Sequence, residues 1–190
     1  MRSKRFFFLF LVPLFIVFLG MRPFILQAAL PAHMTIEGES QGNIEGSCEQ
    51  QGREGTIVVY SFGHSVRQPF DPQSGIFSGQ RIHDPLEILK AVDKSSPKLY
   101  KALCDKEKLS NVTIKFYRIN SEGFEENYFT ITLTNAYIVK IAPSFPPTFV
   151  PENVTYRYVE IVTMTYQTIK WTWEDGSLEH QDSWSSAPIG

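Results

Sequence analysis

The chain has 190 residues, 43% of them hydrophobic, and its 18 Lys and Arg side chains against 20 Asp and Glu give a net charge of −2. Four of the basic residues and none of the acidic ones lie in the first 28 positions, so residues 29–190 hold 14 against 20, a net charge of −6. An acidic domain without a stripe of Lys and Arg binds nucleic acid poorly, because neutralised phosphates supply most of that affinity. We therefore expect no nucleic-acid partner.

The first 28 residues differ in composition from the rest. Three basic residues near the start precede an apolar run from Phe6 to Gly20, and small residues follow at Ala28 and Ala29. Fifteen apolar residues suit a secretory signal better than a membrane span, which needs about 20. A cleaved signal, which implies the periplasm, and a membrane anchor through residues 6–20 both remain open. Neither belongs to the folded part, which we expect to be a single domain over residues 29–190.

Strand patterns dominate that domain. Alternating or β-branched runs separated by Gly, Pro and Asn predict seven or eight strands joined by short antiparallel connections. This number of strands is typical of a β-sandwich or a β-barrel. The predicted strands are Met34–Glu39, Thr56–Phe62, Pro85–Val92, Asn111–Tyr117, Phe124–Asn135, Tyr137–Ile141 and Tyr156–Thr172, with a proline-rich loop at Pro143–Pro151.

One segment has a helical pattern, from Ser95 to Lys106. Ser96 is the predicted N-cap, and Pro97 suits the first turn. Three apolar residues spaced three and four apart predict a buried stripe: Leu99, Ala102 and Leu103.

Residues capable of catalysis are few. Cys48 and Cys104 lack the spacing of a zinc site, and we expect them to be buried thiols. His83 and Asp84 are adjacent on a strand, so they point to opposite faces and cannot form the orienting pair of a catalytic triad. We predict no enzymatic activity, no catalytic residues, no metal site and no cofactor.

The three tryptophans suggest packing roles instead. Trp171 and Trp173 lie two residues apart on one face of the last predicted strand, as core or interface anchors. Trp184 lies in a polar tail, and we expect it to dock either on its own domain or on a neighbour.

The longest stretch that fits neither a helix nor an ordinary hairpin turn is Phe70–Pro85. Its turn-forming residues fall at Asp71-Pro72, Ser74-Gly75 and Ser78-Gly79. A loop of this length is either functional or disordered, and the apolar Ile76 and Phe77 argue against a merely solvated linker. We predict an ordered protrusion that needs a partner surface.

Several motifs in this order resemble one protein family. The sequence DPQSG is followed by SGQRIH in the long loop, then by Lys115-Phe116-Tyr117-Arg118, FTITLTNA from Phe129, and a final strand with tryptophan. Together they resemble the haemolysin-coregulated protein family, the tube subunit of bacterial type VI secretion systems, over about residues 29–190. The resemblance implies an antiparallel β-barrel of two packed sheets with one α-helix, like a phage tail tube. It also implies a ring-stacking loop that contains Asp71, Pro72, Gln73, Ser74, Gly75, Ile76, Phe77, Gly79, Gln80, Arg81 and His83.

The same resemblance implies partners and a route. Copies of the chain would form a ring, expected to be a hexamer, and rings would stack into a tube that carries effectors and contacts the spike and sheath of the apparatus. The subunit would be cytoplasmic before assembly and then secreted. Since that family is made without a signal, sequence read upstream of a mistaken start is a third interpretation of residues 1–28. A monomeric exported β-barrel that binds an apolar ligand is the alternative function.

Overall fold

The computed structural model describes residues 30–153 and 157–184. The expectations for residues 1–28 therefore lie outside the described residues. Six antiparallel strands close a barrel in the order β8-β7-β1-β3-β6-β9 and back to β8. Their bounds are β1 (Ala32–Gly38), β3 (Ile57–Gly63), β6 (Leu86–Ala91), β7 (Leu109–Ile119), β8 (Glu125–Ser144) and β9 (Val159–Thr165). The predicted mainly β fold, an antiparallel barrel with one helix, is confirmed.

Strand β8 is longer than predicted. The expected strands Phe124–Asn135 and Tyr137–Ile141 are one element, which passes through Asn135 with a left-handed backbone (φ 51°). Before Asn135 it pairs with β10 (Thr168–Trp173), and after it with β9. Pro143 and Ser144 still pair with β9, so the proline-rich loop begins two residues later than predicted and contains the 3₁₀ turn η1 (Pro151–Asn153).

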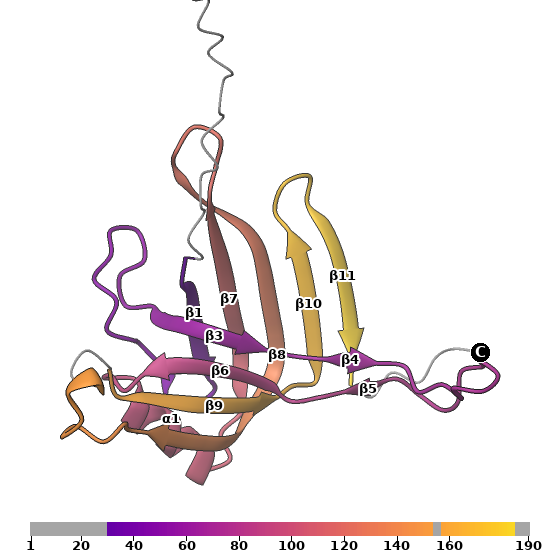
Figure 1. The fold of residues 1–190 in the computed structure, drawn as a ribbon, viewed down its shortest axis with the longest axis horizontal. Coiled ribbons are helices and arrows are strands. Elements are labelled where there is room, and N and C mark those ends of the chain that lie inside the picture. The colour runs from indigo at the N-terminus through magenta and orange to yellow at the C-terminus, as the bar shows by residue number, and fades with distance from the viewer. Residues whose placement is uncertain (1–29, 154–156, 185–190) are drawn as a thin grey trace, which may run out of the picture.

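The last predicted strand is instead two strands. Strand β9 ends at Thr165, and β10 begins at Thr168 after Gln167, whose backbone N–H is 3.1 Å from the carbonyl oxygen of Thr134. Strand β11 (Leu178–Ser183), which the sequence pattern did not predict, pairs with β10 to form a hairpin outside the barrel. In Figure 1 this hairpin and the β7–β8 hairpin extend to the same side, away from the helix. A short β2 (Gly42–Asn43) pairs with the end of β1.

The barrel interior is filled by inward-facing side chains. On β1, Met34 and Ile36 are buried while Thr35 and Glu37 are exposed, as alternation on a half-buried strand requires. The same alternation on the other barrel strands supplies a continuous core, whose fully buried members include Ile57, Leu86, Ile88, Leu109, Ile114, Leu133 and Met164.

The helix α1 (Ser96–Cys104) covers the end of the barrel opposite the two hairpins (Figure 1). The predicted stripe is confirmed, because Leu99 and Ala102 are buried and Leu103 packs against the core. The predicted N-cap is wrong by one position. Ser95 occupies the cap position, without a capping hydrogen bond from its side chain, and Ser96 is the first helical residue.

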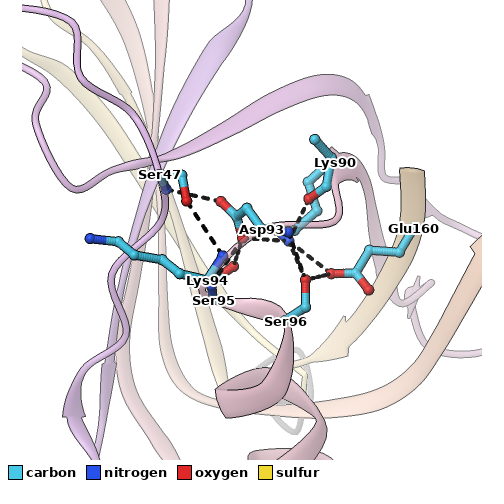
Figure 2. A network of polar contacts seen from close by, with 8 residues as sticks. Ser47, Lys90, Asp93, Lys94, Ser95, Ser96 and Glu160 are labelled. Carbon is cyan, nitrogen blue, oxygen red and sulfur yellow. Dashed lines mark hydrogen bonds and ion pairs between the residues drawn. The ribbon is translucent and has the colours of Figure 1, made fainter. Parts of the chain in front are cut away.

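Figure 2 shows why the Ser96 hydroxyl is not available as a cap in the predicted way. The Lys90 ammonium, at the end of β6, lies 2.8 Å from Glu160 Oε1 on β9 and 3.1 Å from Ser96 Oγ. Ser96 Oγ in turn donates to Glu160 Oε1 at 2.7 Å. Lys90 and Glu160 are each only 1% exposed, so this network joins two barrel strands to the helix start away from water.

Candidate functional site

The most prominent feature outside the barrel is a protruding hairpin between β3 and β6, here called the arm (residues 66–83). Its base is formed by β4 (Val66–Arg67) and β5 (Ile82–His83), which pair antiparallel. Figure 1 shows it extending from the barrel toward one end of the molecule's long axis. The sequence pattern did not predict this pairing, because β4 and β5 have two residues each and carry no visible alternation.

The arm tip is ordered by its own backbone. Phe70 and Phe77 form a β-bridge, and the N–H of Asp71 donates to the carbonyl of Ile76 at 2.9 Å. The Asp71 carboxylate accepts from the N–H of Gln73 at 2.9 Å and from Ser74 Oγ at 2.7 Å. These hydrogen bonds lower the pKa of Asp71, so the tip carries a fixed negative charge. Gly75 (φ 71°) takes the left-handed backbone that a side chain would oppose.

Apolar side chains at this tip face solvent. Phe70 is 59% exposed, Ile76 68% and Phe77 74%. A tip with a fixed shape and three uncovered apolar groups has the properties of a contact surface. The predicted loop residues from Asp71 to Gln80 all lie in this exposed segment.

Arg81 and His83 lie at the arm base instead. The Arg81 guanidinium is bonded to the Asp182 carboxylate of β11, and His83 Nε2 lies 3.1 Å from Asp182 Oδ2. Burial opposes ionisation of Asp182, but hydrogen bonds from Arg81 and from the N–H of Ser183 outweigh it and lower the pKa of this carboxyl. The arm is thus fixed to the last described strand by a charged contact.

A second set of contacts completes the arm base. The Tyr166 hydroxyl lies 2.9 Å from His83 Nδ1 and 2.6 Å from His64 Nε2. One proton arrangement satisfies every group with both rings neutral: His64 donates to Tyr166, Tyr166 donates to His83, and His83 donates to Asp182. If both rings were protonated, both would donate to Tyr166 and its hydroxyl proton would lose its acceptor. Burial and the charge of the neighbouring His83 lower the pKa of His64, which opposes protonation of both rings at once.

The tryptophans occupy different environments. Trp184 docks on its own domain, stacked on His83 with ring centroids 5.9 Å apart. Trp171 is half-buried against the core and stacks on His180 of β11. Trp173, on the same face of β10, is exposed and meets Tyr128 edge-on.

The expectations for the other reactive residues have mixed outcomes. Cys104 is exposed and Cys48 only half-buried, so the expectation of two buried thiols is wrong. Both are free thiols. Asp84 accepts a hydrogen bond from Ser65 Oγ at 2.7 Å and is not His83's partner. Within residues 30–153 and 157–184, no group of three or more His, Cys, Asp and Glu could hold a metal ion, and no helix is long and apolar enough to cross a membrane.

Comparison with known proteins identifies the family. The sequence profile described as "Type VI secretion system effector, Hcp" matches residues 33–173. The chain belongs to the Hcp family. Hcp proteins are structural rather than enzymatic, so the prediction of no enzymatic activity is confirmed.

Individual Hcp relatives agree with this assignment. The Major exported protein of Pseudomonas aeruginosa is 39% identical over 171 residues, which cover 85% of this chain and 99% of that protein. A double mutant of Hcp1 from the Escherichia coli EAEC 042 pathovar is 34% identical with a TM-score of 0.73, over 82% of this chain and 99% of that one. Secreted protein Hcp3 from P. aeruginosa is 33% identical with a TM-score of 0.68, over 84% and 100%.

Proposed function

We propose that this Hcp protein is a structural subunit of the type VI secretion tube. Copies close into hexameric rings, and the rings stack through the arm into a hollow tube that carries effectors and is exported with them. Membership of the Hcp family is the observation that carries this proposal.

Two features of the fold support assembly. The arm tip presents an ordered apolar surface that its own barrel does not cover. Strand β11 pairs with β10 on one side, and among the described strands nothing pairs with its other edge. An open sheet edge is a site for association between copies, and closing a ring removes such edges.

The proposed route follows from the same family. The subunit is cytoplasmic until assembly, then leaves through the apparatus, where it meets the spike, the sheath and effector cargo. The N-terminal residue of the protein purified from its native cell tests this route. A first residue within Phe6–Gly20 or before it would contradict this route, and cleavage of a longer precursor at Ala28 or Ala29 would favour a secretory signal instead. A chain that never contains this run even as a precursor would support the route.

The alternative, a monomeric carrier of an apolar ligand, has less support from the structure. The barrel interior is filled by core side chains. A surface cavity of about 380 Å³ is lined by polar groups that include His33, Arg53 and Lys115, with threonine hydroxyls around them. Such a lining does not suit an apolar ligand.

Size-exclusion chromatography with light scattering separates the two functions. A ring gives several times the subunit mass of the protein, and a carrier gives one subunit mass. Replacing residues 73–79 by two glycines should leave the barrel folded and the rings intact but abolish stacking and secretion. Normal tubes from this variant would contradict the role of the arm, and a purely monomeric native protein would contradict the tube.

A further inference from the structure

The arm leaves the barrel at one end of β3 and β6, and an apolar surface lies at the other end of the same strands. Strand β6 begins at Leu86, next to the arm, and runs to Ala91. The chain after β6, the loop after β8 and the start of β9 meet there, at the opposite end of the long axis in Figure 1.

Exposed residues of this region are brought together by one aromatic pair, one backbone hydrogen bond and one side-chain hydrogen bond. Phe145 and Tyr158 pack edge-on with ring centroids 4.6 Å apart. The N–H of Val92 donates to the carbonyl of Tyr158 at 2.9 Å, and Arg157 donates to the Tyr60 hydroxyl at 3.0 Å. All these side chains are exposed. We call this group, Tyr60, Val92, Phe145, Arg157 and Tyr158, the distal patch.

The charges of the arm tip and the distal patch are opposite. Arg157 hydrogen-bonds a neutral hydroxyl, and no salt bridge to it forms among the described residues. At the arm tip, Asp71 is held ionised by hydrogen bonds from Gln73 and Ser74. The distal patch therefore has a cation, Arg157, beside its apolar groups, and the arm tip at the other end of the long axis has an anion, Asp71.

We propose that the arm tip of one copy packs on the distal patch of a copy in the next ring, with Phe70, Ile76 and Phe77 against Phe145, Val92 and Tyr158, and Asp71 beside Arg157. This contact rests on the proposed tube function and identifies the surface that receives the arm. Because two different surfaces meet, the contact is heterologous: each copy inserts its arm tip into one neighbouring ring and binds an arm tip from the ring on the other side. Such a contact can repeat indefinitely along one axis. That is the symmetry that an open stack of rings requires.

Disulfide trapping tests the contact directly. In a Cys48→Ser, Cys104→Ser background expressed from the full-length reading frame, Phe77→Cys combined with Phe145→Cys should give a ladder of covalently linked chains on oxidation. The matched control combines Phe77→Cys with Phe124→Cys, because Phe124 is at least as exposed as Phe145 but lies at the tip of the β7–β8 hairpin. The control should give no ladder.

Substitutions without disulfides supply the second readout. Phe77→Ser and Tyr158→Ser should each raise the concentration needed for stacking at least about tenfold and leave single rings unchanged, whereas Phe124→Ser should do neither. Tubes visible by electron microscopy with no ladder from the Phe77→Cys, Phe145→Cys pair, or with an equal ladder from the control pair, would overturn this contact while the tube function stands. A protein that forms no rings or tubes would overturn both.

Discussion

The two ends of β6 differ in what they bury: polar groups are buried at one end, and apolar groups are exposed at the other. Where β6 leads into α1, Lys90 near the end of β6 and Glu160 on β9 are buried in a network that joins the two strands to the start of the helix, here called the helix end. Before β6, the arm tip satisfies its polar groups locally and leaves its apolar ones in solvent. The helix end therefore contributes to the stability of one copy, whereas the arm tip keeps a shape whose apolar groups can gain burial only in a partner. Mutations at the helix end should therefore change the stability of one copy, and mutations at the arm tip should change assembly.

The largest effect is expected at the helix end. Glu160→Leu removes the β9 carboxylate from the buried Lys90 ammonium, which keeps its ion pair with Asp93 at 3.0 Å. Leaving a buried charge unpaired costs about 3–5 kcal/mol, so with one of two partners kept we expect a loss at the lower end, about 3 kcal/mol. Chemical denaturation should show this loss. Adding Lys90→Met should restore much of the stability, because the charge that needs a partner is then gone. A single variant as stable as the parent would mean that Asp93 alone satisfies Lys90 and that the ion pair with Glu160 adds no stability.

A smaller effect is expected at the arm base. Trp184→Ala removes the ring stacked on His83 and Tyr166, which should lower the free energy of unfolding by about 1 kcal/mol. The arm should also become more susceptible to limited proteolysis near Arg81, since its anchor on the last strand is weakened. Trp173→Ala, an exposed tryptophan on β10, is the matched control and should leave proteolysis of the arm unchanged.

The arm base should also respond to pH. Because the pKa of His64 is lowered in the folded protein, the unfolded chain takes up the proton more readily below the ordinary value of 6.5. The free energy of unfolding should therefore fall as pH drops below 6.5, by at most about 1.4 kcal/mol per pH unit for each proton taken up. His33, whose pKa is also lowered by burial, contributes in the same direction. His64→Gln should flatten the curve but not abolish its slope, and an unchanged slope would contradict the proton arrangement at Tyr166.

The smallest effect on stability is expected at the arm tip. Phe77→Ser should change the free energy of unfolding by no more than about 0.5 kcal/mol, because the side chain is largely exposed and is not among the described residues that form the core or pack against it. Chemical denaturation of the unstacked protein, compared between the parent and the variant at one protein concentration, measures this. A loss of several kcal/mol would show that the tip stabilises its own copy, which would contradict the separation of assembly at the arm tip from stability at the helix end.

The sequence predicted what depends on local pattern. Alternation located the barrel strands, and the spacing of Leu99, Ala102 and Leu103 located the buried face of the helix. The N-cap was missed by one residue because the Ser96 hydroxyl bonds to Lys90 and Glu160, and the second of these is 64 positions away. Competition of this kind between a local cap and a distant partner is invisible in a single sequence.

The two parts of the arm differ in the same way: local sequence predicted the tip, and distant partners form the base. Turn residues and exposed apolar groups marked the arm tip, although its role in stacking stays a prediction. The arm base could not be predicted, because Asp182 and Tyr166 lie 99 and 83 positions from His83. The only local signal was the aromatic residue Trp184 in a polar tail, which did indicate that something docks there.

Strand β8 has a mechanical consequence. Its unbroken backbone runs from the outer hairpin, through pairing with β7 and β10, to the helix end, where it pairs with β9 and packs against α1. A force along this strand would load many interstrand hydrogen bonds in shear at once, since they lie perpendicular to it, rather than peel them apart one by one. A thrust applied at one end of the barrel would therefore reach the other end through covalent bonds, along a path with a left-handed residue at Asn135 and a shift of pairing register between Ile138 and Lys140.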